Sequence, residues 1–246
     1  MKEIPVLFEN DVCMVLNKPH GLAVQGGEGV STSLDSILSE KYSPRPLLVH
    51  RLDRDTSGAI LVAKTKGAAA AFSTLLAGSV NGAAITGGEK KSRAIVKQYW
   101  GVCAGIPRPP QGIIRHKLDA LGEARGKFRG ERGAKQQESL THYKVLSSST
   151  AGEVACSLVE LELGTGRMHQ IRRHLAGIGH PLLGDDKYGD FPLNKKLKKA
   201  CGIKRMLLHA VRLAIPPVPD LLPQGLDISA PLPDYFALFA PSTPNA

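Results

Sequence analysis

The sequence predicts an α+β fold with a mixed, mostly antiparallel β-sheet and flanking helices. Short apolar segments rich in β-branched residues follow one another as hairpin-like pairs, which is typical of antiparallel strands. Helix-like segments are inserted between these pairs and do not alternate regularly with single strands, as they would in a parallel βαβ fold. The chain has 246 residues, of which 42% are hydrophobic and 22% are charged. It is therefore large enough to bury a core, and global disorder is excluded.

The first third of the chain is expected to open with a hairpin. Its two apolar runs are separated by Glu9-Asn10-Asp11. A turn with Pro19 and Gly21 ends the second run, since proline lacks a ladder donor and glycine tolerates positive φ. The residues around Ser33 resemble a capping box, which predicts a helix start. In order, we expect strands over 4–8 and 12–16, a helix over 33–41, a buried strand over 58–64, and a helix over 67–77.

The rest of the chain continues this mixture of strands and helices. Glycine and serine mark loops, and β-branched and aromatic residues mark strands. In order, we expect a loop over 79–93, a strand over 94–104, hairpin strands over 142–148 and 153–163, a basic helix over 167–176, and a strand over 206–215. The last 31 residues, 216–246, contain eight of the 17 prolines and are expected to run extended over the surface.

The charge balance indicates a polyanionic partner. Lysine and arginine total 32 against 22 acidic residues, a formal net charge of +10, and nucleic acid is the first candidate for such an excess. A basic, solvated surface without a partner is the alternative. Residues 115–135 contain seven lysines and arginines and suit a flexible arm along phosphates. Residues 195–205 contain six and no acid, which suits a basic helix or turn.

Cysteine usage and hydropathy narrow the class of protein further. Cys13, Cys103, Cys156 and Cys201 are widely spaced, so there is no CxxC zinc or redox signature. We expect reduced, mostly buried thiols in a cytoplasmic protein. The N-terminus lacks the apolar core of a signal peptide, and no run of 18 apolar residues predicts a membrane span. No metal site is expected.

Three segments carry residue types suited to chemistry. In 50–58, HRLDRDTSG, an aspartate held among arginines could act as a nucleophile or base, but the same residues also fit loop ion pairs that only shape a turn. In 164–189, glycines precede a basic segment and favour anion binding, without a Rossmann or Walker A pattern. Tyr99 projects from the predicted strand at 97–105, where it either stacks on a base or belongs to the core.

The order of these segments resembles one family. HRLDRDTSG at 50–58 resembles the central HRLDxxTSG motif of the RluA-type RNA pseudouridine synthases. The other blocks that resemble this family, in its order, are 9–27, Lys97-Gln98-Tyr99, 164–189, and 207–215 with 229–236. Trp100-Gly101 departs from it, because alanine-type residues are more usual there. The resemblance covers nearly the whole chain, and five ordered blocks are far more specific than one HRLD.

The resemblance implies a single pseudouridine-synthase-like catalytic domain over 1–246, with a central RNA-binding cleft and no preceding S4 RNA-binding domain. Asp53 takes the place of the catalytic aspartate, and Tyr99 that of the tyrosine that packs on the target uracil. Arg167 takes the place of the basic residue that pairs with the aspartate, and Arg172 is a second candidate for that pair. RNA contacts are expected from His50, Arg51, Arg54, His169, Gln170, Arg172, Lys195 and Lys196.

The implied reaction isomerises uridine to pseudouridine in rRNA or tRNA. It breaks the N1–C1′ bond, rotates the uracil and rejoins it through C5, so neither a cofactor nor a metal is expected. The uridine must first be flipped out of the RNA, and Arg51 would fill the gap. Whether Asp53 attacks C1′ or C6, or removes a sugar proton, stays open. RNA is the expected partner, with no membrane and no obligate protein partner.

Two other classes of protein are weighed against this one. A non-catalytic, basic RNA-binding protein would show the same surface charge. A glycoside or nucleotide hydrolase would use two carboxylates that flank the scissile bond. Asp53 and Asp55 are the candidates for such a pair, but their spacing suits that chemistry poorly, and Asp55 matches a variable position of the family motif.

Overall fold

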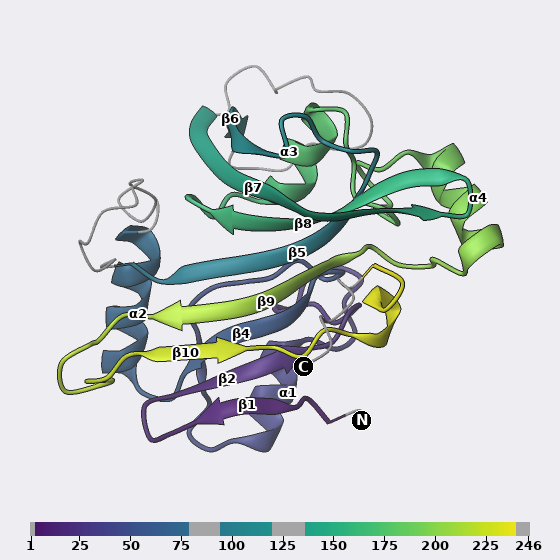
Figure 1. Cartoon of the computed structure of the whole chain (residues 1–246). Coiled ribbons are helices and arrows are strands. Elements are labelled where there is room, and N and C mark those ends of the chain that lie inside the picture. Colours follow the sequence, from purple (N-terminus) through teal and green to yellow (C-terminus); the bar gives the residue numbers. More distant parts are fainter. Residues whose placement is uncertain (1–2, 79–93, 120–135, 240–246) are drawn as a thin grey trace, which may run out of the picture. The chain divides into compact units, whose positions relative to one another are not determined.

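The strands and helices of the chain divide between two units. The computed structural model describes residues 3–78, 94–119 and 136–239, with the elements labelled in Figure 1. Unit 1 comprises Met1–Gln98 and His209–Leu232, and unit 2 comprises Tyr99–Leu208 and Pro233–Ala246. Strands and helices occur in both units, and the strand pairs are mostly antiparallel, which confirms the predicted α+β class. The single domain expected over 1–246 stays a prediction.

Unit 1 contains a mixed sheet in which β1, β2, β4 and β9 are successive neighbours. β3 pairs with β4, and β10 pairs with β9. Every pair is antiparallel except β4 with β9, which is parallel where Ser57 and Gly58 face His209 and Ala210. The strands are β1 (Val6–Glu9), β2 (Cys13–Lys18), β3 (Leu47–Leu48), β4 (Ser57–Ala63), β9 (Leu208–Ile215) and β10 (Leu226–Ser229).

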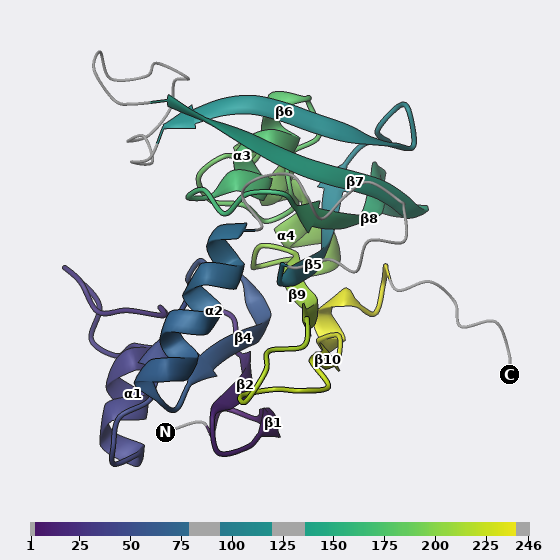
Figure 2. The ribbon, with the colours of Figure 1, turned by 90° about the vertical axis from the view of Figure 1, so that its left-hand side faces the viewer.

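The core of unit 1 lies around β4, whose seven residues are all buried. Helix α2 (Lys66–Gly78) packs on this strand (Figure 2), and its Phe72 joins Val15 and Leu61 in the main apolar cluster. Helix α1 (Leu34–Lys41) begins at the predicted cap. The Ser36 N–H donates to Ser33 Oγ at 3.1 Å, and the Ser33 N–H donates to Ser36 Oγ at 3.0 Å. This reciprocal pairing satisfies two of the donors that a helix start leaves free.

Gly58 is required where β4 meets β9. Its φ is +109°, a conformation that side chains rarely adopt. A Cβ at this position would lie 2.3 Å from the carbonyl oxygen of Ala210 and 2.6 Å from the Ala210 nitrogen. The glycine that ends the HRLDRDTSG segment therefore allows the close backbone approach of the two parallel strands.

Unit 2 contains strands in the order β5, β8, β7 and β6. β7 forms the predicted hairpin with β8 and is also antiparallel to β6. Helix α3 packs against β6 and β7, and helix α4 packs against β7. The elements are β5 (Val96–Ala104), β6 (Gln111–Asp119), β7 (Gln136–Ala151), β8 (Val154–Leu163), α3 (Gln170–Gly177), α4 (Phe191–Cys201) and a 3₁₀ turn at Asp234–Phe236.

Three sequence predictions need correction. The start of the basic 115–135 segment is not a flexible arm, because 111–119 forms β6, in which Ile114 and Leu118 are buried and the basic residues between them are exposed. The basic helix begins at Gln170, three residues later than predicted, because the left-handed φ of +52° at His169 breaks the helix. The 216–246 segment is not extended throughout, since it contains β10 and the 3₁₀ turn. Residues 79–93 and 120–135 lie outside the described residues.

Candidate active site

The HRLDRDTSG segment forms the connection between β3 and β4 in unit 1. Asp53 is half-buried between the buried side chains of Leu52 and Thr56. Its backbone carbonyl accepts the Thr56 N–H at 3.1 Å, which closes a tight turn directly before β4. Asp53 is therefore partly accessible and stands in a turn that directly precedes a buried strand.

Lys18 supports this turn by a hydrogen bond to its backbone. It was not among the residues predicted from the sequence. Its side chain is fully buried, and its Nζ donates to the carbonyl oxygens of Pro19 (2.9 Å), Leu22 (2.8 Å) and Arg54 (3.0 Å). Burial lowers the pKa of Lys18 to about 7, against the opposing attraction of the Asp55 and Asp53 carboxylates. The signal in the sequence was a lysine at the end of an apolar strand, directly before Pro19.

We expect Lys18→Met to lower catalytic activity by at least about tenfold. The substitution removes the hydrogen bond from Lys18 to the Arg54 carbonyl, which fixes the turn that carries Asp53. The variant also tests the pKa. Between pH 7 and 10.5 the unfolded chain retains a proton that folded Lys18 has lost, so the wild-type free energy of unfolding should rise with pH relative to that of the variant. Urea unfolding at pH 6, 7.5 and 9 measures this difference. A difference that is constant over this range would contradict the lowered pKa.

Two histidines contact the same turn and strand β4, one from within the segment and one from β9. His50 Nε2 accepts the Leu61 N–H of β4 at 2.9 Å, and burial lowers the pKa of His50 to about 3, so the ring is neutral. His209 of β9 lies with its Nδ1 2.8 Å from Ser57 Oγ, and burial lowers the pKa of His209 to about 4. The backbone therefore occupies the Nε2 of His50, and the RNA contact predicted for this residue stays a prediction.

The remaining charged residues of the segment differ in exposure. Arg51 and Arg54 are exposed, as RNA-contacting side chains must be. Asp55 is half-buried and lies 3.4 Å from Arg54 Nε and 3.8 Å from His20 Nε2. These two contacts fit a structural role for the Asp55 carboxylate within the turn.

In unit 2, the GTGRMHQ segment is organised around the buried amide of Gln170. Gln170 Oε1 accepts the Thr165 hydroxyl at 2.5 Å and the Arg167 backbone N–H at 3.1 Å. Gln170 Nε2 donates to the Leu140 carbonyl at 2.8 Å and to Thr141 Oγ1 at 2.9 Å. Gln170 is 2% exposed, so its predicted RNA contact is revised to a role in fixing the backbone of Arg167. Arg167 itself is half-buried.

Arg172 forms a buried ion pair instead of an RNA contact. Its Nε and Nη2 donate to Asp185 Oδ2 and Oδ1 at 2.8 and 2.7 Å, and both side chains are at most 5% exposed. Burial acts to raise the pKa of Asp185, but the Arg172 hydrogen bond and charge, with the Tyr188 and Lys187 N–H groups, outweigh it and lower this pKa. Because its guanidinium is occupied, Arg172 is removed from the candidates for both RNA binding and the catalytic ion pair.

The other predicted residues of unit 2 fall into a buried and an accessible set. Tyr99 on β5 is 5% exposed. His169 is half-buried, and its Nδ1 lies 3.0 Å from the Tyr188 hydroxyl. Lys195 and Lys196 are exposed on α4. The two lysines are thus accessible and Tyr99 is buried, and the roles predicted for all three stay predictions.

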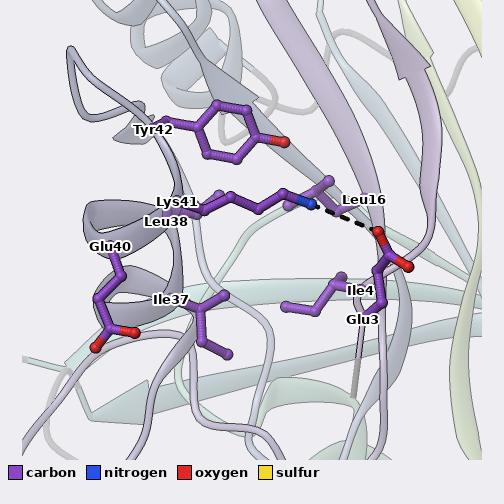
Figure 3. Close-up of a pocket in the computed structure, with 8 residues that line it drawn as sticks. All are labelled: Glu3, Ile4, Leu16, Ile37, Leu38, Glu40, Lys41 and Tyr42. Carbon is purple, nitrogen blue, oxygen red and sulfur yellow. Dashed lines mark ion pairs between the residues drawn. The ribbon is translucent and has the colours of Figure 1, made fainter. Parts of the chain in front are cut away.

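Unit 1 also contains a cavity of about 450 Å³ that is unrelated to the predicted chemistry (Figure 3). Leu16, Ile37 and Leu38 form much of its apolar wall. Lys41 and Glu3, which form an ion pair at 3.6 Å, also line it. The cavity contains none of the predicted site residues, so we do not assign it to the reaction.

The structure also bears on the cysteines, on metal-ligating clusters and on membrane-spanning helices. All four cysteines are free, three of them are buried, and burial raises the pKa of Cys13 to about 11 and that of Cys103 to about 12. Among the residues that the structure describes, no cluster of three metal-ligating side chains is present. Within the same residues, no helix is long and apolar enough to cross a membrane.

Comparison with known proteins shows which family shares these features. The family model for RNA pseudouridylate synthase matches residues 12–177. The chain is 38% identical over 195 residues to RNA pseudouridine synthase 4, mitochondrial, of Arabidopsis thaliana, covering 75% of this chain and 40% of the relative. It is 35% identical over 207 residues to ribosomal large subunit pseudouridine synthase C of Haemophilus ducreyi, covering 83% of this chain and 59% of the relative. The chain therefore spans about half the length of these curated relatives.

A solved structure agrees with the sequence comparisons. The human RNA pseudouridylate synthase domain containing 4 matches with a TM-score of 0.68 and 28% identity, over 95% of this chain and 90% of that chain. The family match begins before Lys18, includes the Asp53 turn, Arg167 and Gln170, and ends with α3, before His209. The chain belongs to the RNA pseudouridylate synthase family.

Proposed function

We propose that this protein isomerises uridine to pseudouridine in RNA, with Asp53 as the catalytic carboxylate. The observation that supports this most strongly is the turn at 50–58. It holds Asp53 half-buried on a turn that three contacts tie to its surroundings. Lys18 Nζ donates to the Arg54 carbonyl, the His50 ring accepts the Leu61 N–H, and the Ser57 hydroxyl lies against His209. A reaction that breaks and remakes a glycosidic bond within one nucleotide needs a fixed acidic group more than it needs an added cofactor.

Tyr99 and Arg167 are proposed to act on the same uridine as Asp53. Tyr99 would hold the detached uracil against its ring, and Arg167 would keep the Asp53 carboxylate ionised. The rigid backbone that Gln170 gives to Arg167 supports this assignment, because a guanidinium must be well placed to pair with one carboxylate. Arg51 and Arg54, both exposed, would contact the RNA around the flipped nucleotide.

Ribosomal RNA is the substrate class that we propose first. The Haemophilus ducreyi relative is named a ribosomal large subunit pseudouridine synthase, and the net charge of +10 suits a folded RNA. Transfer RNA stays the alternative. The cytoplasmic location predicted from the sequence stays a prediction.

Tritium release tests the reaction. Ribosomal RNA and tRNA transcripts that contain [5-³H]uridine are incubated with the full chain. Formation of the C5–C1′ bond displaces the hydrogen at C5, so tritium should enter the water while the base stays in the polymer. Release of free uracil would instead indicate a hydrolase, and binding without either product would indicate a non-catalytic RNA-binding protein. Mapping pseudouridine in total RNA, with and without this protein, then identifies the modified position.

A further inference from the structure

Helix α4 of unit 2, labelled in Figure 1, carries an unusual combination of exposed side chains. Phe191, at its first turn, is 59% exposed, which is high for so large an apolar side chain. Lys195, Lys198 and Lys199 follow it at i+4, i+7 and i+8, which is the spacing of one helical face. The helix thus combines one exposed aromatic ring and three cations along a single surface, which we call the α4 face (Phe191, Lys195, Lys198 and Lys199).

The opposite side of α4 is firmly attached to unit 2. Leu197 is 1% exposed. Asn194 Oδ1 accepts the Gly184 N–H, and Asn194 Nδ2 donates to the Asp185 carbonyl, both at 2.9 Å. The Asp190 side chain caps the helix by accepting the Leu193 N–H at 2.9 Å. Because the inner side fixes the orientation of the helix, the α4 face is held toward solvent.

The charges of the α4 face are not balanced within the helix. Residues 191–201 include no acid, so lysines at i, i+3 and i+4 repel one another. Asp190 is used by the helix cap, and the exposed Asp186 lies 3.2 Å from Arg172. A polyanion that lies along the face would relieve this repulsion, and its binding would be favoured by the release of counterions.

The exposed ring indicates which kind of RNA fits. In a duplex the bases are stacked on each other, and an aromatic side chain outside the grooves has no base to contact. Unpaired nucleotides can stack on a ring while nearby lysines contact their phosphates. We propose that the α4 face is an accessory binding surface for single-stranded RNA, separate from the Asp53 turn. This inference rests on the proposal that RNA is the substrate.

Fluorescence anisotropy with the full chain tests the surface. The probes are a labelled 12-nucleotide oligouridylate and a labelled RNA hairpin with a 12-base-pair stem. We expect the triple variant Lys195→Ala, Lys198→Ala, Lys199→Ala to bind oligouridylate with a salt slope that is shallower by about 2. Phe191→Leu should bind oligouridylate about fivefold more weakly, with a smaller change for the stem, while Phe191→Trp retains the affinity.

Matched controls separate the α4 face from general charge and apolar area. Lys66→Ala removes an exposed lysine of unit 1, and Leu238→Ala removes a side chain that is 69% exposed. Both should bind oligouridylate as wild type does, and circular dichroism checks that every variant is folded. Unchanged affinity of Phe191→Leu, equal losses for both probes, or a preference of the α4 face for anionic vesicles over RNA would overturn the inference. Tritium release by the wild type is read separately, so a failed α4 test leaves the proposed reaction standing.

Discussion

Asp53→Asn should reduce tritium release from [5-³H]uridine RNA by at least about 10³-fold. Asparagine has nearly the same shape as aspartate and preserves the backbone turn, in which the Asp53 carbonyl accepts the Thr56 N–H. It cannot act as a base or as an anionic nucleophile. RNA affinity should stay within about twofold of wild type, because the variant loses one negative charge and no phosphate-binding cation.

Asp55→Asn is the matched control for this prediction. Asp55 stands two residues away in the same turn and is also half-buried, but it lies beside Arg54 and His20. We expect this variant to retain activity within about threefold. Retained turnover in Asp53→Asn together with a loss in Asp55→Asn would transfer the catalytic role to Asp55. Loss in both, with normal folding, would revive the two-carboxylate mechanism of a hydrolase.

Asp185→Asn should lower the free energy of unfolding by about 3–5 kcal/mol, since it leaves the buried Arg172 guanidinium without its buried counter-ion and with only the exposed Asp186 nearby. The wild-type pair gives two hydrogen bonds of 2.7 and 2.8 Å, and Asp185 also accepts two backbone N–H groups. An amide can keep some of these bonds but supplies no charge. Urea unfolding at pH 7 measures the difference.

Asp186→Asn provides the control for the buried pair. Asp186 lies 3.2 Å from the same guanidinium but is 70% exposed, so its loss should cost less than about 1 kcal/mol. The pH dependence gives a second test. Because the pKa of Asp185 is lowered in the folded state, its stabilisation is present above the usual pKa of 3.8 and is lost as pH falls through the folded value. Equal destabilisation by the two variants would contradict the importance of burial.

The sequence predicted most strands and helices because their patterns were local. The capping box at Ser33 and the apolar run of β4 needed no tertiary information. β6 was missed because Arg115 and Lys117 lie on its exposed face, so its alternation was interpreted as a basic arm. A strand with a charged face can be told from such an arm only when its partner is known.

Site residues were predictable by type and order but not by environment. The motif identified Asp53, yet no local pattern shows that Lys18 is fully buried and binds the backbone of the same turn. Arg172 and Gln170 were assigned to RNA because they lie in the basic block at 164–189 that resembles the family. Gln170 bonds Thr165 and Leu140, 5 and 30 positions away, and Arg172 bonds Asp185, 13 positions away. The motif does not show which of its polar residues pair with each other. A motif therefore identifies polar residues such as Gln170 and Arg172, but it does not show whether they are exposed for binding or buried to support the fold.

The long-range tie between Ser57 and His209 has a consequence for synthesis of the protein. The turn that carries Asp53 is translated early, but its last support comes from a strand encoded some 150 residues later (the two residues are 152 positions apart). A nascent chain on the ribosome therefore cannot complete this support until residue 209 has left the exit tunnel. The turn that carries Asp53 therefore gains its full set of contacts only when the chain is nearly complete.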